Sequence, residues 1–152
     1  MSKIQFIRRV QKLAISVEEA WHFFSTPENL VKITPPFLDF KITSELDEAE
    51  IYTGQVISYK VKPLLGISLL WVSEITHVER HKLFVDEQMK GPYKLWHHEH
   101  HFKTVTGGTE MTDIVQYKIP FGLLGSLGLP FVKKQLDDIF NYRRRKVEEL
   151  FI

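Results

Sequence analysis

Hydrophobic and polar residues alternate along much of the chain, most clearly between Tyr93 and Val105, which reads YKLWHHEHHFKTV. Because successive side chains of a β-strand point to opposite faces, this segment has one aromatic face and one charged face. The aromatic face carries Trp96, His98, His100 and Phe102. The charged face carries His97, Glu99, His101 and Lys103 and is typical of a solvated surface. The pattern predicts an inward-facing strand that sets two imidazoles between aromatic side chains.

The next strand, Thr109–Ile119, follows Gly107-Gly108, a dipeptide typical of a two-residue hairpin turn. A turn at these two glycines pairs His98 with Tyr117 and places Asp113 diagonal to His100, because cross-strand partners share a face. We therefore expect a polar cluster on an otherwise apolar inner face. Its expected members are His98, His100, Asp113 and Tyr117. Buried polar groups are costly without hydrogen-bond partners, so these side chains should bond to one another.

Alternation and turn residues predict five further strands. They are Lys3–Leu13, Phe37–Thr43, Gly54–Lys62, Ile67–His77 and Leu83–Met89. A capping-box pattern, with Ser16 as the N-cap and Glu19 three residues later, predicts a helix that ends near Thr26-Pro27. A second short helix is expected from Pro27 to about Ile33.

The last 20 or so residues, from about Pro130 to Phe151, predict a long amphipathic helix with one apolar stripe. The stripe consists of Val132, Leu136, Ile139, Phe140, Arg143, Val147, Leu150 and Phe151. Such a stripe needs a large apolar partner, and the concave face of the sheet is the candidate. Glycines at 122, 125 and 128 make the preceding segment, 121–131, a predicted loop. We expect this loop and 63–70 to gate a cavity mouth.

Composition narrows the function classes. The 152 residues, 43% hydrophobic and 26% charged, predict one globular domain over 1–152. The net charge of +1 indicates no overall attraction to nucleic acid or anionic membrane, and the RRRK run at 143–146 has acidic neighbours. The absence of cysteine excludes disulfides and thiolate zinc sites. Without a recognisable signal segment or membrane span, we expect a cytoplasmic monomer or homodimer.

The order of elements and several local motifs resemble the START-like superfamily, also called SRPBCC, and within it the small bacterial single-domain proteins. This superfamily includes the birch pollen allergen and polyketide cyclase-like domains. The motifs are Phe84-Val85-Asp86-Glu87-Gln88, Gly91-Pro92-Tyr93, Trp96-x-His98-x-His100-x-Phe102, Asp113-x-x-x-Tyr117-x-x-Pro120 and Tyr142-Arg143. The resemblance implies an α+β helix-grip fold, in which a seven-stranded antiparallel sheet wraps around the carboxy-terminal helix. It also implies a hydrophobic ligand, lipid-, polyketide- or aromatic-like, between the sheet and that helix.

The expected ligand-binding residues come from the strands and the last helix. They are Trp71, Asp86, Gln88, Trp96, His98, His100, Phe102, Asp113, Tyr117, Phe140 and Arg143. The facing of Asp86 and Gln88 is ambiguous, because counting back from Arg80-His81 and counting forward to Gly91-Pro92 give opposite answers. One of these loops must be longer than two residues or bulged, and the resemblance favours Asp86 and Gln88 inward.

Three alternative roles remain for the histidines. A cyclase or dehydratase could use His98 or His100 as a base with Asp113 and Tyr117 in support, so we leave open whether the chain is an enzyme. A metal could lie between His98 and His100, with Asp113 and His77 as further ligands. Strand spacing places two ligands where three or four are needed, so we assign no metal and no cofactor. A structural role, in which carboxylate and phenol hydroxyl pin the rings, is the third.

Overall fold

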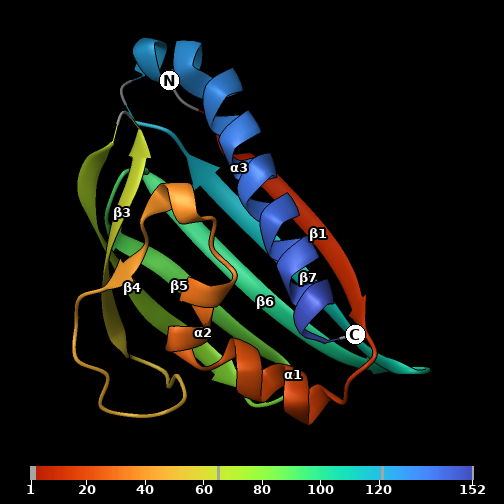
Figure 1. Ribbon diagram of the computed structural model, residues 1–152. Helices are drawn as coiled ribbons and strands as arrows, with labels where there is room; N and C mark the ends of the chain where they lie inside the picture. Colours follow the sequence, from red (N-terminus) through yellow and green to blue (C-terminus); the bar gives the residue numbers. More distant parts are fainter. Residues whose placement is uncertain (1–2, 65, 121, 152) are drawn as a thin grey trace.

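A seven-stranded antiparallel sheet curves around one long helix in the computed structural model, which describes residues 3–64, 66–120 and 122–151 (Figure 1). The strands are β1 Gln5–Leu13, β2 Lys41–Ile42, β3 Val56–Leu64, β4 Ile67–Glu79, β5 Leu83–Lys90, β6 Leu95–Val105 and β7 Gly108–Lys118. The helices are α1 Val17–Phe24, α2 Pro27–Lys32, the short 3-10 helix η1 Pro36–Leu38, and α3 Gly122–Leu150. This is the α+β helix-grip architecture predicted from the sequence.

The sheet order β1-β7-β6-β5-β4-β3-β2 places β6 near the centre, with β7 and β5 on either side. Helix α3 runs diagonally across the concave face, and α1 and α2 close one end of it (Figure 1). Ser16 caps α1 as predicted, because its side chain accepts a hydrogen bond from the Glu19 backbone N–H at 3.1 Å. The antiparallel ladder brings the middles of β5, β6 and β7 side by side beneath α3.

Two apolar clusters flank the centre of the concave face. At the α1 end, Trp21 packs edge-on against Phe84 and Phe102, with ring centroids 5.8 and 5.3 Å away. Toward the start of α3, a second cluster joins sheet and helix. Its buried members are Trp96, Val115, Tyr117, Ile119, Leu136 and Phe140. The face between these clusters is where the predicted polar side chains lie.

The turn between β6 and β7 differs from the prediction. Val105 pairs with Gly108, so the turn is Thr106-Gly107, with Gly107 at φ 81°. Gly108 belongs to strand β7. A Cβ at this position would lie 1.9 Å from the Leu13 carbonyl oxygen of β1. The second glycine therefore serves close approach rather than the turn.

This turn shifts the predicted pairing of β6 with β7 by two residues. Asp113 lies directly opposite His100, and Tyr117 lies opposite Trp96 rather than His98. A shift of two keeps every side chain on its face, since the side-chain period of a strand is two. Trp96, His98, His100 and Phe102 are accordingly all buried, as predicted.

Two element predictions are wrong. The segment Phe37–Thr43 is not one strand, because Asp39 adopts a left-handed conformation (φ 44°) between η1 and the two-residue strand β2. The predicted gate loop 121–131 is helical from Gly122 onward, and Phe121 itself lies outside the described residues. Leu129 and Val132 pack against the second apolar cluster, which offsets the low helix propensity of the glycines and of Pro130.

The conflict over the facing of Asp86 is resolved by both loops. The turn after β4 has three residues, 80–82, with His81 at φ 66°, and a register shift between Ile75 and His77 compensates for it. The loop between β5 and β6 spans four residues, 91–94. Asp86 therefore pairs with Ile75 on one side and with His98 on the other, and it faces inward.

Candidate functional site

Four ionisable side chains form one hydrogen-bonded cluster at the centre of the concave face. His98 Nε2 lies 2.8 Å from Asp113 Oδ1, and His100 Nε2 lies 2.6 Å from Asp86 Oδ2. Each imidazole is thus paired with a carboxylate from a different neighbouring strand, Asp113 on β7 and Asp86 on β5. Cross distances are longer, 4.0 Å from His98 Nδ1 to Asp86 Oδ2 and 3.5 Å from His100 Nδ1 to Asp113 Oδ1. We call Asp86, His98, His100 and Asp113 the His–Asp cluster.

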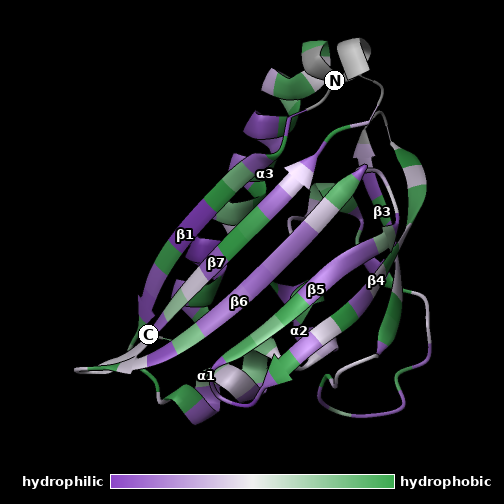
Figure 2. Ribbon diagram, turned by 180° about the vertical axis from the view of Figure 1, so that it is seen from behind, coloured by the Kyte–Doolittle hydropathy of each residue, from purple (hydrophilic) through white to green (hydrophobic). Residues whose placement is uncertain are grey.

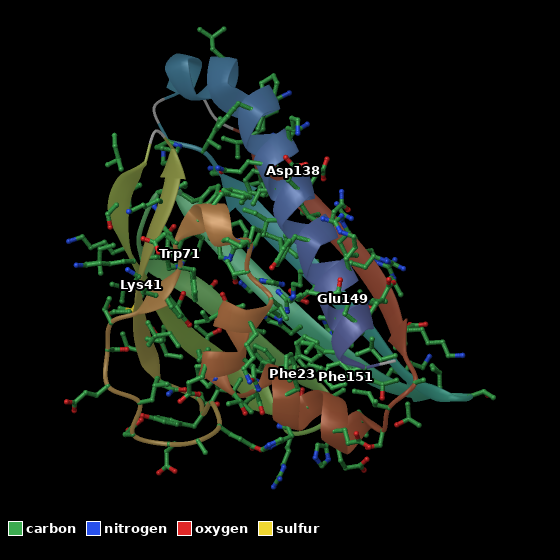
Figure 3. All side chains as sticks on the ribbon, in the orientation of Figure 1. Phe23, Lys41, Trp71, Asp138, Glu149 and Phe151 are labelled. Atoms are coloured by element: carbon green, nitrogen blue, oxygen red, sulfur yellow. The ribbon has the colours of Figure 1, made fainter. Side chains whose placement is uncertain are left out.

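Aromatic side chains enclose the rings of the cluster. The His98 and His100 rings stack with centroids 3.7 Å apart, and Phe84 stacks on the other side of His100 at 4.0 Å. Phe140 from α3 approaches His98 at 5.9 Å, and Trp96 approaches it edge-on at 6.1 Å. This packing holds the imidazole planes in place and excludes water from both ring faces. Figure 3 shows side chains filling the space between the sheet and α3.

Burial and charge set the ionisation of the cluster. Burial opposes charge on Asp113, but Arg143, His98 and His100 outweigh it and lower the pKa of that carboxyl below its usual range. Burial likewise opposes charge on Asp86, but the hydrogen bond from His100 together with the charges of His100, His98 and Arg143 outweighs it and lowers the pKa of that carboxyl. Burial, with the charge of His98, lowers the pKa of His100 to about 4 despite both aspartates. At neutral pH the cluster therefore presents two carboxylates and a neutral His100.

Arg143 supplies a positive charge from α3. Its guanidinium lies over the Phe24 ring at 5.6 Å, and it shares a small cavity of about 10 Å³ with His100 and Asp113. A volume of this size holds about one water molecule. The charge of Arg143 contributes to the lowered pKa of both Asp86 and Asp113.

A larger groove lies between η1 and α3. Its volume is about 350 Å³. It is lined by Pro35, Pro36, Phe37, Asp138, Asn141, Tyr142 and Arg145. Figure 3 labels Asp138 on the α3 side of this groove. The volume falls within the range of small-molecule sites, about 300–1,000 Å³.

Several predicted site residues lie outside the cluster. Tyr117 packs against Trp96 and Tyr93 instead of bonding His98, a consequence of the turn at Thr106-Gly107. Trp71 donates its indole N–H to Ser73 Oγ at 2.9 Å and packs on Trp96 at 5.3 Å, so it belongs to the aromatic wall. Phe102 belongs to the cluster around Trp21.

Gln88 has a local structural role. Its side chain donates to the Tyr93 carbonyl at 2.6 Å and accepts from the Tyr93 N–H at 3.1 Å. It fits against Gly91, where a Cβ would lie 2.6 Å from Gln88 Oε1. Gln88 therefore fastens the loop between β5 and β6.

Sequence reasoning missed three aromatic residues at the site. Phe84 stacks on His100, and its position two residues before Asp86 on one strand was the available signal. Tyr93 packs against both Trp71 and Trp96. Tyr59 of β3 is buried, and burial, reinforced by the charge of Asp86, raises its pKa.

Three residues of the His–Asp cluster are candidate ligands for a metal ion. Asp86, His98 and His100 each offer one ligand atom, and these atoms lie within 4.8 Å of one another. The imidazole rings are stacked at an interplanar angle of 24°, so their nitrogen lone pairs run side by side instead of converging. Both Nε2 atoms also engage carboxylates. The arrangement favours hydrogen-bonded pairs over tetrahedral coordination.

The outer face of β6 carries a second, half-buried row of histidines. His97 bridges Glu87 at 2.7 Å and Glu99 at 3.0 Å, and Glu99 also pairs with His101 at 2.8 Å. Partial burial opposes charge on His97, but the two glutamates outweigh it and raise its pKa. This row is a surface ion-pair network and faces away from α3.

Comparison with known proteins identifies the fold. No protein-family model matches the chain, and no curated protein matches it in sequence. Among solved structures, an uncharacterized protein from Rhizobium leguminosarum superposes with a TM-score of 0.70 at 12% identity, over 98% of this chain and 97% of that chain. Major latex-like protein 151 from Panax ginseng gives 0.68 at 12% identity over 98% of both chains. A protein from Thermus thermophilus gives 0.67 at 15% identity over 95% of both.

These likenesses span nearly the whole chain and show the helix-grip fold, as the sequence motifs implied. At 12–15% identity they establish the fold alone. No helix in the described part of the chain is long and apolar enough to cross a membrane.

Proposed function

We propose that the protein binds a hydrophobic small molecule between the sheet and α3, and that the His–Asp cluster receives the polar group of that molecule. The observation that carries this proposal is the accessibility of the two carboxylates. Asp86 and Asp113 keep 19% and 15% of their side-chain surface accessible, whereas the His98 and His100 side chains keep 6% and 9%. Each carboxylate has spare acceptor capacity directed at the inner space, within walls that are otherwise aromatic.

The ionisation of the cluster restricts the chemistry of the ligand. Ionised carboxylates accept hydrogen bonds and cannot donate them. Asp86 and Asp113 have lowered pKa values and therefore favour a ligand that donates, through a hydroxyl or an amine. A ligand carboxylate would meet two like charges and one arginine. We therefore propose a neutral or cationic donor group on an apolar, lipid-, polyketide- or aromatic-like body.

The space beside the cluster is small in this structure. The cavity at His100, Asp113 and Arg143 measures about 10 Å³, so a ligand requires α3 to move away from the sheet. The groove of about 350 Å³ between η1 and α3 already separates the helix from its neighbour on one side. The proposal therefore includes an outward displacement of α3 on ligand entry.

Two measurements on the purified full chain test the proposal. Native mass spectrometry should show an adduct that organic extraction removes. The neutral probe N-phenyl-1-naphthylamine, which carries one N–H donor, should bind the extracted protein with enhanced fluorescence. The isosteric change Asp113→Asn should weaken probe binding roughly tenfold, the value of one charge-assisted hydrogen bond. Asp138→Asn, at the exposed groove rim, is the matched control. A chain free of adducts that also fails to bind the probe would contradict the proposal.

A second candidate function is acid–base catalysis on the bound molecule, of the cyclase or dehydratase type. The observation that favours it is the orientation of each imidazole by a carboxylate, an arrangement that fixes a tautomer. His100, with a pKa near 4, is a weak base at neutral pH, so His98 is the proposed base. His98→Gln should then abolish turnover of an identified substrate while leaving its affinity within about threefold. Equal loss of affinity and turnover would indicate a binding role alone.

A further inference from the structure

Lysines and acidic residues are unevenly distributed between the two ends of the molecule. Segments 3–7, 60–73, 88–96 and 116–136 together contain eight lysines and no aspartate or glutamate. Since the whole chain has a net charge of +1, the remaining residues carry a net charge of −7. The overall charge balance therefore conceals a strong polarity.

The antiparallel topology gathers these segments at one end. The starts of β1, β4 and β6 meet the ends of β3, β5 and β7 there, and α3 also begins at this end (Figure 1). We call it the lysine end. Lys62 and Lys134 pair with Asp39 and Asp138. The other six lysines form no ion pair within the residues that the structure describes. They are Lys3, Lys60, Lys90, Lys94, Lys118 and Lys133.

Large apolar side chains are exposed at the same end. On α3, Leu127 is 79% and Phe131 is 53% exposed. On β4, Ile67, Leu69 and Leu70 are between 36% and 56% exposed. Strand β4 extends past its neighbour here, because β5 ends at Lys90 opposite Val72. Figure 2 shows green, hydrophobic segments at the start of α3 and at the start of β4.

These two apolar tips lie at the same end of the molecule (Figure 1). The Gln135 side chain of α3 donates to the Pro63 carbonyl of β3, which joins helix and hairpin one turn below Phe131. This hydrogen bond links the two tips. Aliphatic and aromatic side chains at the rim, with lysines around them, form an amphipathic surface.

We infer that the lysine end docks on an anionic lipid bilayer, with the apolar tips entering the interface and the lysines contacting lipid headgroups. Lysine stems extend along apolar surface and place the ammonium group at the headgroup level, which suits this arrangement. Charge complementarity selects an anionic surface, and the exposed aliphatic side chains select a bilayer over nucleic acid. Nucleic-acid surfaces typically combine lysine or arginine with base-stacking groups, whereas the tips are mostly aliphatic. The inference does not depend on the proposed ligand.

Vesicle flotation with the full chain tests this inference. Phosphatidylcholine vesicles that contain phosphatidylglycerol should bind the protein, and vesicles of phosphatidylcholine alone should bind it far less. Replacing Lys90, Lys94 and Lys133 together by glutamine should lower the partition coefficient roughly 100-fold, because each lysine near an anionic surface contributes roughly a fivefold factor. Rising sodium chloride should weaken binding by the unmodified chain in the same direction.

Matched controls distinguish vesicle binding by the lysine end from binding through positive charge or hydrophobic side chains elsewhere on the protein. Lys12, Lys82 and Lys103 are exposed at the opposite end, and their replacement by glutamine should change partition less than twofold. Phe131→Ser should lower partition about tenfold. Phe37→Ser, at a residue that is 54% exposed beside the middle of α3, should leave it unchanged.

Three results would overturn the inference. The first is equal binding to both vesicle types, and the second is an equal loss of vesicle binding in the two triple-lysine variants. The third is binding to a nucleic-acid duplex that is tighter than binding to the anionic vesicles and is lost in the variant of Lys90, Lys94 and Lys133. Thermal unfolding of each variant confirms that it is folded. The salt series on the unmodified chain tests the electrostatic part without any substitution.

Discussion

His100 is a buried imidazole whose neutral form the fold prefers. Its pKa is lowered to about 4 by burial and by His98, against an unfolded value of about 6.5. Protonation between these values therefore favours the unfolded chain, so this contribution is complete above pH ~6.5 and is lost as the pH falls toward 4. We expect the free energy of unfolding, measured with urea, to fall by about 3 kcal/mol over that window. The lowered carboxyl pKa values of Asp86 and Asp113 extend the loss below pH 4.

Two variants assign this pH dependence. His100→Gln removes the titrating ring and should flatten the profile between pH 6.5 and 4, whatever its effect on stability at neutral pH. His22→Gln, at a side chain that is 76% exposed, should leave the profile unchanged. An unaltered slope in the His100 variant would contradict the assignment.

Asp113 is the carboxylate on which both an imidazole and Arg143 depend. Asp113→Ala leaves the His98 N–H without its buried acceptor and removes the carboxylate charge near Arg143, and we expect a loss of about 3 kcal/mol in the free energy of unfolding. Asp138→Ala removes a surface pair with Lys134 and should change stability by less than about 0.5 kcal/mol. Equal effects in chemical denaturation would show that the cluster is not structurally coupled.

For single residues, the sequence predicted the face of the sheet on which each side chain lies, but it did not predict its partner on the neighbouring strand. Strand alternation placed His98, His100 and Asp113 inward because the two-residue period holds whatever the register. It could not choose between partners, since the turn position decides which carboxylate reaches which ring. The inward facing of Asp86 depends on the lengths of two loops and on a register shift in β4. None of these features has a local signature in the sequence.

At the scale of elements, the β6–β7 turn depends on two glycines with different duties. Gly108→Ala should lower the free energy of unfolding by about 3 kcal/mol, because its Cβ would meet the Leu13 carbonyl and β1 would have to shift. Gly54→Ala provides a matched control. It also has positive φ but open space around it, so it should cost only about 1 kcal/mol of backbone strain. Urea denaturation of both variants measures the difference, and similar losses would mean that β1 adjusts freely.

Propensity and periodicity predicted the elements whose residues agree with their surroundings. Helix α1 and strands β3 to β7 are of this kind, with clear caps or alternation. The start of α3 is the opposite case, because three glycines and Pro130 argue locally for a loop, while packing of Leu129 and Val132 against the second apolar cluster favours helix. Tertiary contacts of this sort are absent from any local pattern.

At the scale of the whole molecule, α3 is fastened more strongly at one end than at the other. Toward its carboxyl end, Arg9 bonds Asn141 and Asp137, Gln11 donates to the Arg144 carbonyl, and Arg144 donates to the Val10 carbonyl. Phe151 packs against Phe23 of α1 at 5.0 Å (Figure 3). Toward the start of α3, the Gln135 side chain donates a hydrogen bond to the Pro63 carbonyl on the opposite side of the sheet. Among the described residues, this is the hydrogen bond that holds this part of the helix to that side. This asymmetry predicts that α3 opens from its starting end.

Gln135→Ala tests that direction of opening. Loss of the bond to Pro63 should speed hydrogen–deuterium exchange in a peptide covering 127–136 by roughly fivefold, equivalent to about 1 kcal/mol of local stability. It should also speed release of N-phenyl-1-naphthylamine. Gln11→Ala removes a comparable glutamine-to-backbone bond at the other end, where Arg9 and Arg144 remain, and should alter exchange in 127–136 by less than twofold. If the Gln11 variant opened the start of α3 as much as the Gln135 variant, the helix would move as one rigid body. Ligand entry would then require the whole helix to lift from the sheet.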